Sequence, residues 1–254
     1  MNITSTRTEG GVTERLFDLT VRAERVPGVI WTPEGAEGPR PLVLMGHGGS
    51  QHKRIGFLAN HARAWAKAHG WAVAAIDAPG HGDRVSREEA MALSRRIAER
   101  IAAGTPMGPD MDGAMVQRIA QGGPEWIATL DALQALDFIG DGKVGYFGVS
   151  MGTAIGVPVV ASEPRNTAAV FGLAGLGLGS PTLEDAARRI TIPLEFVFQW
   201  DDEIVSRENG LALFNAFASQ QKTMHINPGG HIAIPAFESA SWERFFLRHL
   251  RIDS

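Results

Sequence analysis

Ser150 is the residue of this chain whose type and surroundings best fit nucleophilic chemistry. The segment 148–152 reads G-x-S-x-G, after the short apolar run 143–147 and before the small apolar residues 153–160. This order predicts a strand, a sharp turn and a helix, with the two glycines leaving room for a turn of unusual backbone angles. The turn would present the hydroxyl at the helix N-terminus, where backbone amides favour negative charge.

A serine hydroxyl is a poor nucleophile at neutral pH, so it needs a base and an acid that orients the base. The acid should follow a later strand and precede the base in the chain. The apolar strand run 194–198 leads into three acids, Asp201, Asp202 and Glu203. Their residue types alone leave the choice between them open.

His231 is the histidine best placed to act as the base. It ends the glycine-rich segment 227–231, directly after the strand expected at 222–226. From such a loop an imidazole can reach back to the serine, whereas His225 lies inside the strand and is expected to be structural. The other six histidines are scattered, and geometry decides such roles.

Backbone amides are expected to stabilise the negative charge that forms on a substrate oxygen. One donor should be the amide of Met151, the residue after the nucleophile. The other should come from the glycine-rich loop 46–50, which follows the apolar run 41–45. Gly49 is the preferred donor and Ser50 the alternative, because glycine lets the backbone approach a substrate closely.

The elements that must position these residues alternate along the chain. Apolar runs at 41–45, 71–76, 143–147, 168–173 and 193–198 predict buried strands, and 222–226 is expected to be the last strand. Helical patterns fall between these segments and at 236–250. Alternating strands and helices predict a mostly parallel sheet with helices on both faces. A helix is expected from Pro124 to Phe138, with the proline in its first turn. Residues 84–121 exceed an ordinary crossover and are interpreted as a small helical cap or lid insertion within a single domain, 1–254.

Composition narrows the classes of function. The chain has 254 residues, 44% of them hydrophobic, no cysteine and a formal net charge of −4. This charge gives no case for a nucleic-acid or membrane partner. Residues 1–12 lack the pattern of a signal peptide and no apolar stretch is long enough for a membrane span, so a cytoplasmic location is expected. No cluster has metal-ligand spacing, so neither a metal nor a cofactor is expected.

Taken together, these motifs make the chain similar to the α/β-hydrolase-fold serine hydrolases over about residues 17–250. The matching segments, in order, are His47-Gly48-Gly49, Asp77-Ala78-Pro79-Gly80-His81-Gly82, Gly148-Val149-Ser150-Met151-Gly152, Asp202-Glu203-Ile204-Val205 and Gly230-His231. The run 26–33 resembles the dienelactone-hydrolase-like and prolyl-oligopeptidase-like branch. The typical dienelactone hydrolase nucleophile is Cys, whereas this chain has Ser150, which favours a general carboxylesterase.

The resemblance implies an eight-stranded sheet and selects Asp202 as the acid, because Asp-x-x-Val follows the strand as in the family pattern. Ser150, His231 and Asp202 would cleave a small-molecule carboxylic ester through an acyl-enzyme, with the amides of Gly49 and Met151 as the oxyanion hole. The alternatives are a thioesterase, a peptidase, a C–C bond hydrolase or an acyltransferase with the same residues, or a non-catalytic ligand receptor. The oligomeric state stays open, with a homodimer as one candidate.

Overall fold

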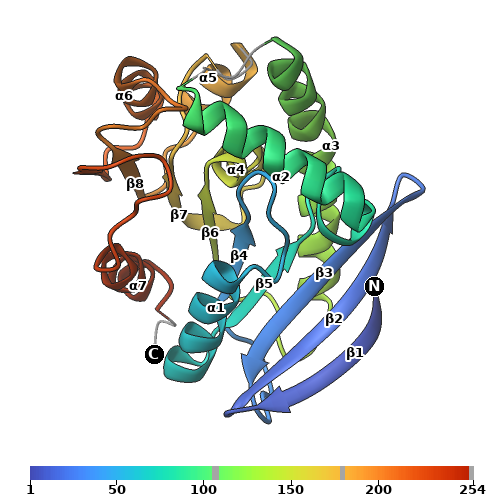
Figure 1. The fold of residues 1–254 in the computed structure, drawn as a ribbon. Coiled ribbons are helices and arrows are strands. Elements are labelled where there is room, and N and C mark those ends of the chain that lie inside the picture. Colours follow the sequence, from blue (N-terminus) through green and yellow to red (C-terminus); the bar gives the residue numbers. More distant parts are fainter. Residues whose placement is uncertain (105–108, 178–180, 252–254) are drawn as a thin grey trace.

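A single sheet of nine strands organises the chain in the computed structural model, which describes residues 1–104, 109–177 and 181–251 (Figure 1). The strand order across the sheet is β1-β2-β3-β5-β4-β6-β7-β8-β9. The strands are β1 (Asn2–Glu9), β2 (Val12–Val21), β3 (Glu24–Pro33), β4 (Leu42–Gly46), β5 (Ala72–Ile76), β6 (Val144–Val149), β7 (Asn166–Gly172), β8 (Leu194–Gln199) and β9 (Lys222–Asn227).

The sheet has an antiparallel start and a parallel centre. β1 to β3 pair with one another in antiparallel fashion, and β3 pairs antiparallel with β5. From β5 through β4, β6, β7 and β8 to β9 every pair is parallel. Every residue of β4, β5, β6 and β8 is buried, as expected for parallel strands that are covered on both faces. The predicted mostly parallel sheet is therefore confirmed.

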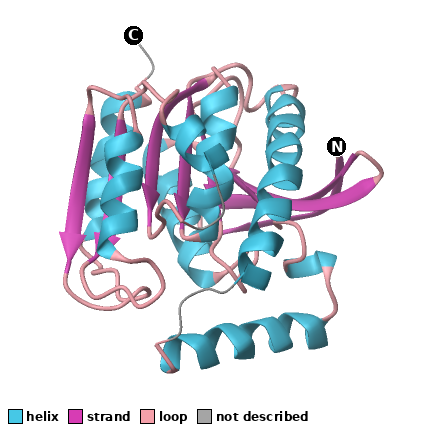
Figure 2. Cartoon of the chain, turned by 90° about the horizontal axis from the view of Figure 1, so that it is seen from above, coloured by secondary structure: helices cyan, strands magenta, loops and turns pink. Residues whose placement is uncertain are grey.

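Helices cover both faces of the sheet, as Figure 2 shows from above. The helices are α1 (Gly56–His69), α2 (Arg87–Ala102), α3 (Pro109–Gln134), α4 (Met151–Ser162), α5 (Pro181–Ala187), α6 (Arg207–Ala216) and α7 (Glu238–His249), with the short 3-10 helix η1 (Gly82–Arg84). Apolar side chains of α1 and α7 pack on one face, and those of α3, α4, α5 and α6 pack on the other. None of the helices in the described ranges has both the length and the apolar character needed to cross a membrane.

Two features differ from the sequence-based prediction. The sheet has nine strands rather than eight, because β1 pairs with β2 although all eight of its residues are exposed. A strand with no buried face leaves no apolar alternation to detect. The second difference is that α3 begins at Pro109 and runs through Pro124, which is not in its first turn. Buried contacts of Met115, Ile119 and Trp126 with the core hold this helix together despite the proline.

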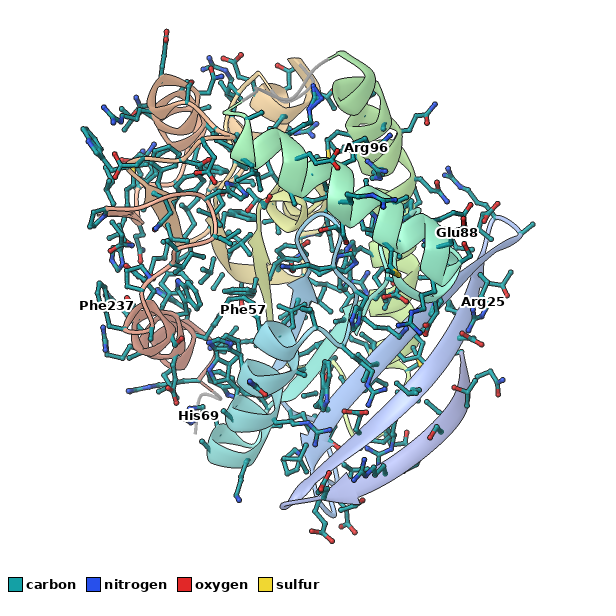
Figure 3. All side chains as sticks on the ribbon, in the orientation of Figure 1. Arg25, Phe57, His69, Glu88, Arg96 and Phe237 are labelled. Atoms are coloured by element: carbon teal, nitrogen blue, oxygen red, sulfur yellow. The ribbon has the colours of Figure 1, made fainter. Side chains whose placement is uncertain are left out.

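The predicted insertion 84–121 contains η1, α2 and the first half of α3, and its residues 105–108 lie outside the described ranges. α2 begins with a capping box, in which the Ser86 hydroxyl accepts from the amide of Glu89 and the Glu89 carboxylate accepts from the amide of Ser86. No residue of α2 is fully buried, and Glu88 and Arg96 extend from it as exposed side chains (Figure 3). α2 is thus an outer element laid over the main body.

Candidate active site

Ser150 lies in the sharp turn between β6 and α4, in the predicted order of strand, turn and helix. Its backbone has φ 55° and ψ −121°, a conformation that costs a residue with a side chain about 1–3 kcal/mol. The unusual backbone angles are therefore those of Ser150, and not those of Gly148 or Gly152 as the sequence suggested. The glycines serve close approach instead, since a Cβ on Gly152 would lie 2.3 Å from the Gly46 carbonyl oxygen, and one on Gly148 would lie 2.6 Å from that of Gly152.

Ser150, His231 and Asp202 form one chain of hydrogen bonds. His231 Nδ1 lies 2.7 Å from Asp202 Oδ2, and because a carboxylate only accepts, the imidazole donates there. The neutral ring then has a free lone pair on Nε2, which lies 3.0 Å from Ser150 Oγ and accepts its proton. The described structure thus brings together the three residues that the sequence singled out, from the turns after β6, β8 and β9.

Asp202 is held by more than the histidine. Its side chain is fully buried, and its other carboxylate oxygen, Oδ1, accepts from the backbone amides of Ile204 at 2.8 Å and Val205 at 2.9 Å. These two donors fix the orientation of the carboxylate, so that Oδ2 faces His231. They also satisfy the charge of an acid that would otherwise be costly to bury.

The neighbouring acids make different contacts. Asp201 is exposed, pairs with Arg207 at 3.5 Å, and accepts from the amide of Gly229 at 3.0 Å. Glu203 Oε2 accepts from the backbone amide of His231 at 2.9 Å and fills the space where a Cβ on Gly230 would stand. Asp202 alone among the three contacts the imidazole, while Glu203 holds the loop that carries it.

The loop after β4 begins in close contact with the turn that holds Ser150. Gly46, at the end of β4, lies so near Gly152 that a side chain on Gly152 would not fit. The amide of Gly48 is already used, since it donates to Gln51 Oε1 at 3.0 Å. Within the described residues the amides of Gly49 and Met151 donate no hydrogen bond, so neither is already used by another acceptor. Their role as the oxyanion hole remains a prediction.

His47 anchors this loop from below. Its Nε2 accepts from the amide of Ala78 at 3.0 Å, so Nδ1 carries the proton and donates to the carbonyl of Gly48 at 2.8 Å. Burial lowers the pKa of His47 to about 4, which keeps the ring neutral and preserves this pair of contacts at neutral pH. The sequence predicted no role for the His47 side chain, because the Ala78 amide that it contacts lies 31 residues away in the chain.

A buried ion pair holds the adjacent turn. Asp77 Oδ2 accepts from Lys53 Nζ at 2.7 Å and from the amide of Asp83 at 2.8 Å, and its Oδ1 accepts from the amide of Lys53. Lys53 also contacts the Asp83 carboxylate at 2.6 Å. Asp77 thus fixes the turn after β5 and connects it to Lys53, just after the Gly49 loop.

α2 lies against the same loop. A Cβ on Gly49 would lie 3.7 Å from Ile97 Cδ1, so the half-buried Ile97 covers the position of the proposed donor. In Figure 1 α2 runs across the upper half of the molecule, in front of the central strands. Ile232, the residue directly after His231 in the chain, is an exposed apolar residue with 81% of its surface accessible.

No protein-family model matches the sequence, and a search of curated proteins finds no match either. Solved structures do match. A cold-adapted esterase from an Arctic intertidal metagenomic library, in a PEG-bound complex, is 35% identical with a TM-score of 0.82, covering 99% of this chain and 100% of that chain.

Two more distant structures share the fold. An acetyl xylan esterase from Paenibacillus sp. R4 is 18% identical with a TM-score of 0.74, covering 98% of this chain and 88% of that chain. A dienelactone hydrolase from Anabaena variabilis is 20% identical with a TM-score of 0.65, covering 95% and 100%. The likeness to the cold-adapted esterase extends to sequence over the full length of both chains. The chain therefore belongs to the α/β-hydrolase-fold esterases and is a carboxylic ester hydrolase.

Proposed function

We propose that this protein cleaves small-molecule carboxylic esters with a triad of Ser150, His231 and Asp202, through an acyl-enzyme intermediate. The observation that carries the proposal is the continuous contact from Asp202 Oδ2 to His231 Nδ1, 2.7 Å, and from His231 Nε2 to Ser150 Oγ, 3.0 Å. Both distances lie within the reach that general-base activation of a serine requires.

In the acylation step, Ser150 Oγ attacks the ester carbonyl carbon while His231 Nε2 takes the hydroxyl proton. Asp202 keeps the proton of His231 on Nδ1 and stabilises the imidazolium that forms. The tetrahedral intermediate then collapses, the bond to the alcohol oxygen breaks, and His231 gives its proton to the departing alcohol. The acyl group stays on Ser150.

In the deacylation step, His231 takes a proton from water, and the hydroxide so formed attacks the acyl carbon. The second tetrahedral intermediate expels Ser150 Oγ, which recovers its proton from His231 and releases the carboxylic acid. Negative charge develops on the carbonyl oxygen in both steps. The amides of Gly49 and Met151 would hold this charge, and losing one such donor typically costs about 3–4 kcal/mol of transition-state stabilisation.

The substrate would meet apolar side chains around the serine. Ile97 of α2 lies over Gly49, and the exposed Ile232 follows the catalytic histidine. We infer that residues 84–121 act as a cap that contacts the acyl or alcohol part of the ester. Apolar groups of the substrate would gain about 25 cal/mol per Å² of surface that they bury there.

Initial rates on p-nitrophenyl acetate test the proposal. Ser150→Ala should lower kcat by roughly 10⁶-fold, as expected when the nucleophile of a triad is removed. Ser162→Ala is the matched control, because Ser162 ends α4, the helix that Ser150 precedes, and among the described residues its hydroxyl donates only to the carbonyls of Pro158 and Val159 in that helix. Retained turnover in Ser150→Ala would overturn the proposal.

The other acyl-transfer reactions considered from the sequence use the same triad and differ in the leaving group. A butyryl ester, a butyryl thioester and a butyryl anilide separate these reactions, because the acyl part is constant. The proposal expects the highest kcat/KM on the oxygen ester. A higher value on the thioester or the anilide would reassign the substrate class and leave the triad in place.

A further inference from the structure

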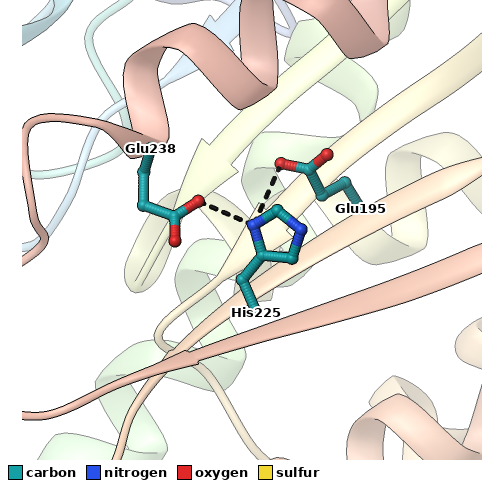
Figure 4. A group of neighbouring side chains, drawn as sticks. All are labelled: Glu195, His225 and Glu238. Atoms are coloured by element: carbon teal, nitrogen blue, oxygen red, sulfur yellow. Dashed lines mark hydrogen bonds and ion pairs between the residues drawn. The ribbon is translucent and has the colours of Figure 1, made fainter.

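Two acids and a histidine outside the proposed triad meet where β8, β9 and α7 come together (Figure 4). Glu195 lies on β8, His225 on β9 and Glu238 at the first position of α7. His225 Nδ1 lies 2.8 Å from Glu238 Oε2 and 3.8 Å from Glu195 Oε1. One ligand atom from each of the three residues lies within 4.8 Å of the others.

Each carboxylate divides its two oxygens in the same way. The outer oxygens are held by neutral donors, since Asn227 Nδ2 donates to Glu238 Oε1 at 2.9 Å and Ser241 Oγ donates to Glu195 Oε2 at 3.1 Å. The inner oxygens both face His225 Nδ1 (Figure 4). Side chains that ligate metals are typically oriented by such supporting hydrogen bonds.

The inner oxygen of Glu195 has no hydrogen-bond partner among the described residues, although the residue is only 5% exposed. The single proton on His225 Nδ1 is directed at Glu238, which is 1.0 Å nearer than Glu195. A buried carboxylate oxygen without a partner is costly, and a cation between the three residues would remove that cost.

We propose that Glu195, His225 and Glu238 bind a divalent transition-metal ion, for which Zn²⁺ is the best-fitting probe. Zn²⁺ binds imidazole nitrogen and carboxylate oxygen at about 2.0–2.2 Å, which separates tetrahedral ligand atoms by about 3.4 Å. The separations of His225 Nδ1 from the two carboxylate oxygens, 2.8 Å and 3.8 Å, each differ from that value by about half an ångström, and the three ligand atoms all lie within 4.8 Å of one another. Binding releases the Nδ1 proton to solvent, and the ion takes that lone pair.

Solvent can reach the site. The side chain of His225 is 35% exposed, and a surface pocket of about 480 Å³ borders Glu195 and Ser241. A water molecule from this side would supply the fourth ligand of a tetrahedral site. The three ligands are widely spaced along the chain, since His225 and Glu238 are 13 residues apart and Glu195 lies on another strand. This spacing explains why no short sequence motif marks the site.

The ion would tie together the elements that carry the triad. β8 leads to Asp202, and β9 leads to His231. A structural ion there would stabilise the folded chain and the spacing of these two loops. It would take no part in the reaction, so the inference is independent of the proposed ester hydrolysis.

Zinc titration of the full, untagged protein after EDTA treatment tests the proposal. Isothermal titration calorimetry should give one Zn²⁺ per chain, and the melting temperature should rise with added ZnCl₂. Glu195→Gln and His225→Gln should each weaken binding at least 10-fold and remove most of the rise in Tm, since each removes one ligand of the set. Anomalous diffraction at the zinc edge should place the ion between the three side chains.

The double variant His69→Gln/Glu243→Gln is the matched control. His69 Nε2 and Glu243 Oε1 form another histidine–glutamate pair at 2.5 Å, between α1 and α7, and no described residue adds a third metal-ligating side chain to it (Figure 3 labels His69). This variant should bind Zn²⁺ like the wild type. Wild-type affinity in Glu195→Gln, or an anomalous peak at His231 instead of His225, would overturn the proposal.

Discussion

Replacing Asp202 by Asn should reverse the tautomer of His231. The two amides of Ile204 and Val205 donate to Asp202 Oδ1, so an Asn at this position must keep its carbonyl oxygen there. The opposite orientation would leave two buried donors unpaired, at about 1–3 kcal/mol each. The Asn amide group therefore faces His231 Nδ1 as a donor, and the ring must accept there.

A His231 ring that accepts at Nδ1 carries its proton on Nε2 and cannot take one from Ser150. The expected loss in kcat is roughly 10⁴-fold, or about 5 kcal/mol, which is the typical effect of replacing the triad Asp of a serine protease by Asn. The assay is the initial rate on p-nitrophenyl acetate, with near-UV circular dichroism to verify the fold.

Asp201→Asn is the control for this prediction. The carboxylate of Asp201 is exposed, and its partners among the described residues are Arg207 and the amide of Gly229, so kcat should stay within about threefold of the wild type. The reasoning is refuted if Asp201→Asn costs as much as Asp202→Asn, or if Asp202→Asn keeps more than about a tenth of the activity.

Three further changes probe the surroundings of the triad. Glu203→Ala removes the acceptor of the His231 amide and should lower kcat about 10-fold at unchanged KM, whereas Glu203→Gln should retain the contact and the rate; equal losses in both would exclude this positioning role. Gly152→Ala places a Cβ 2.3 Å from a backbone oxygen and should destabilise the fold by about 3 kcal/mol or more in urea, whereas Gly123→Ala, with open space around its Cβ, should stabilise it by about 0.5–1 kcal/mol. Burial holds the pKa of His47 at about 4 in the fold, below the ordinary histidine pKa of 6.5, so the contribution of its neutral ring to folding stability is complete above pH 6.5 and is lost as the pH falls toward 4. Between pH 7 and pH 5 the wild type should therefore lose about 2 kcal/mol more unfolding free energy than His47→Gln, and parallel pH curves would contradict this.

Strong local signals explain what the sequence could predict. The parallel centre of the sheet was visible because its strands are buried on both faces and appear as continuous apolar runs. The turn at Ser150 was visible because close packing between Gly152 and Gly46 permits no side chain at either position. The chain order of Ser150, Asp202 and His231 followed from their places in the turns after three parallel strands, β6, β8 and β9, and the structure places these residues in contact.

The features that the sequence did not predict depend on contacts between distant segments of the chain, or belong to an exposed strand that has no apolar periodicity. β1 has no buried residue, so it leaves no apolar period. α3 runs through Pro124 because its packing against the core outweighs the local cost of the proline. Glu203 accepts from the backbone amide of His231, 28 residues further along the chain. Nothing in the acidic run 201–203 distinguishes Glu203 as the residue that makes this contact.

The most direct measurement of the proposed mechanism is mass spectrometry of the protein after treatment with a fluorophosphonate. We expect one adduct per chain, on the peptide that contains Ser150, and much slower labelling in His231→Ala because the base that activates the hydroxyl is gone. Labelling at another residue, or an unlabelled Ser150 in protein that still hydrolyses p-nitrophenyl acetate, would contradict a mechanism in which Ser150 is the nucleophile.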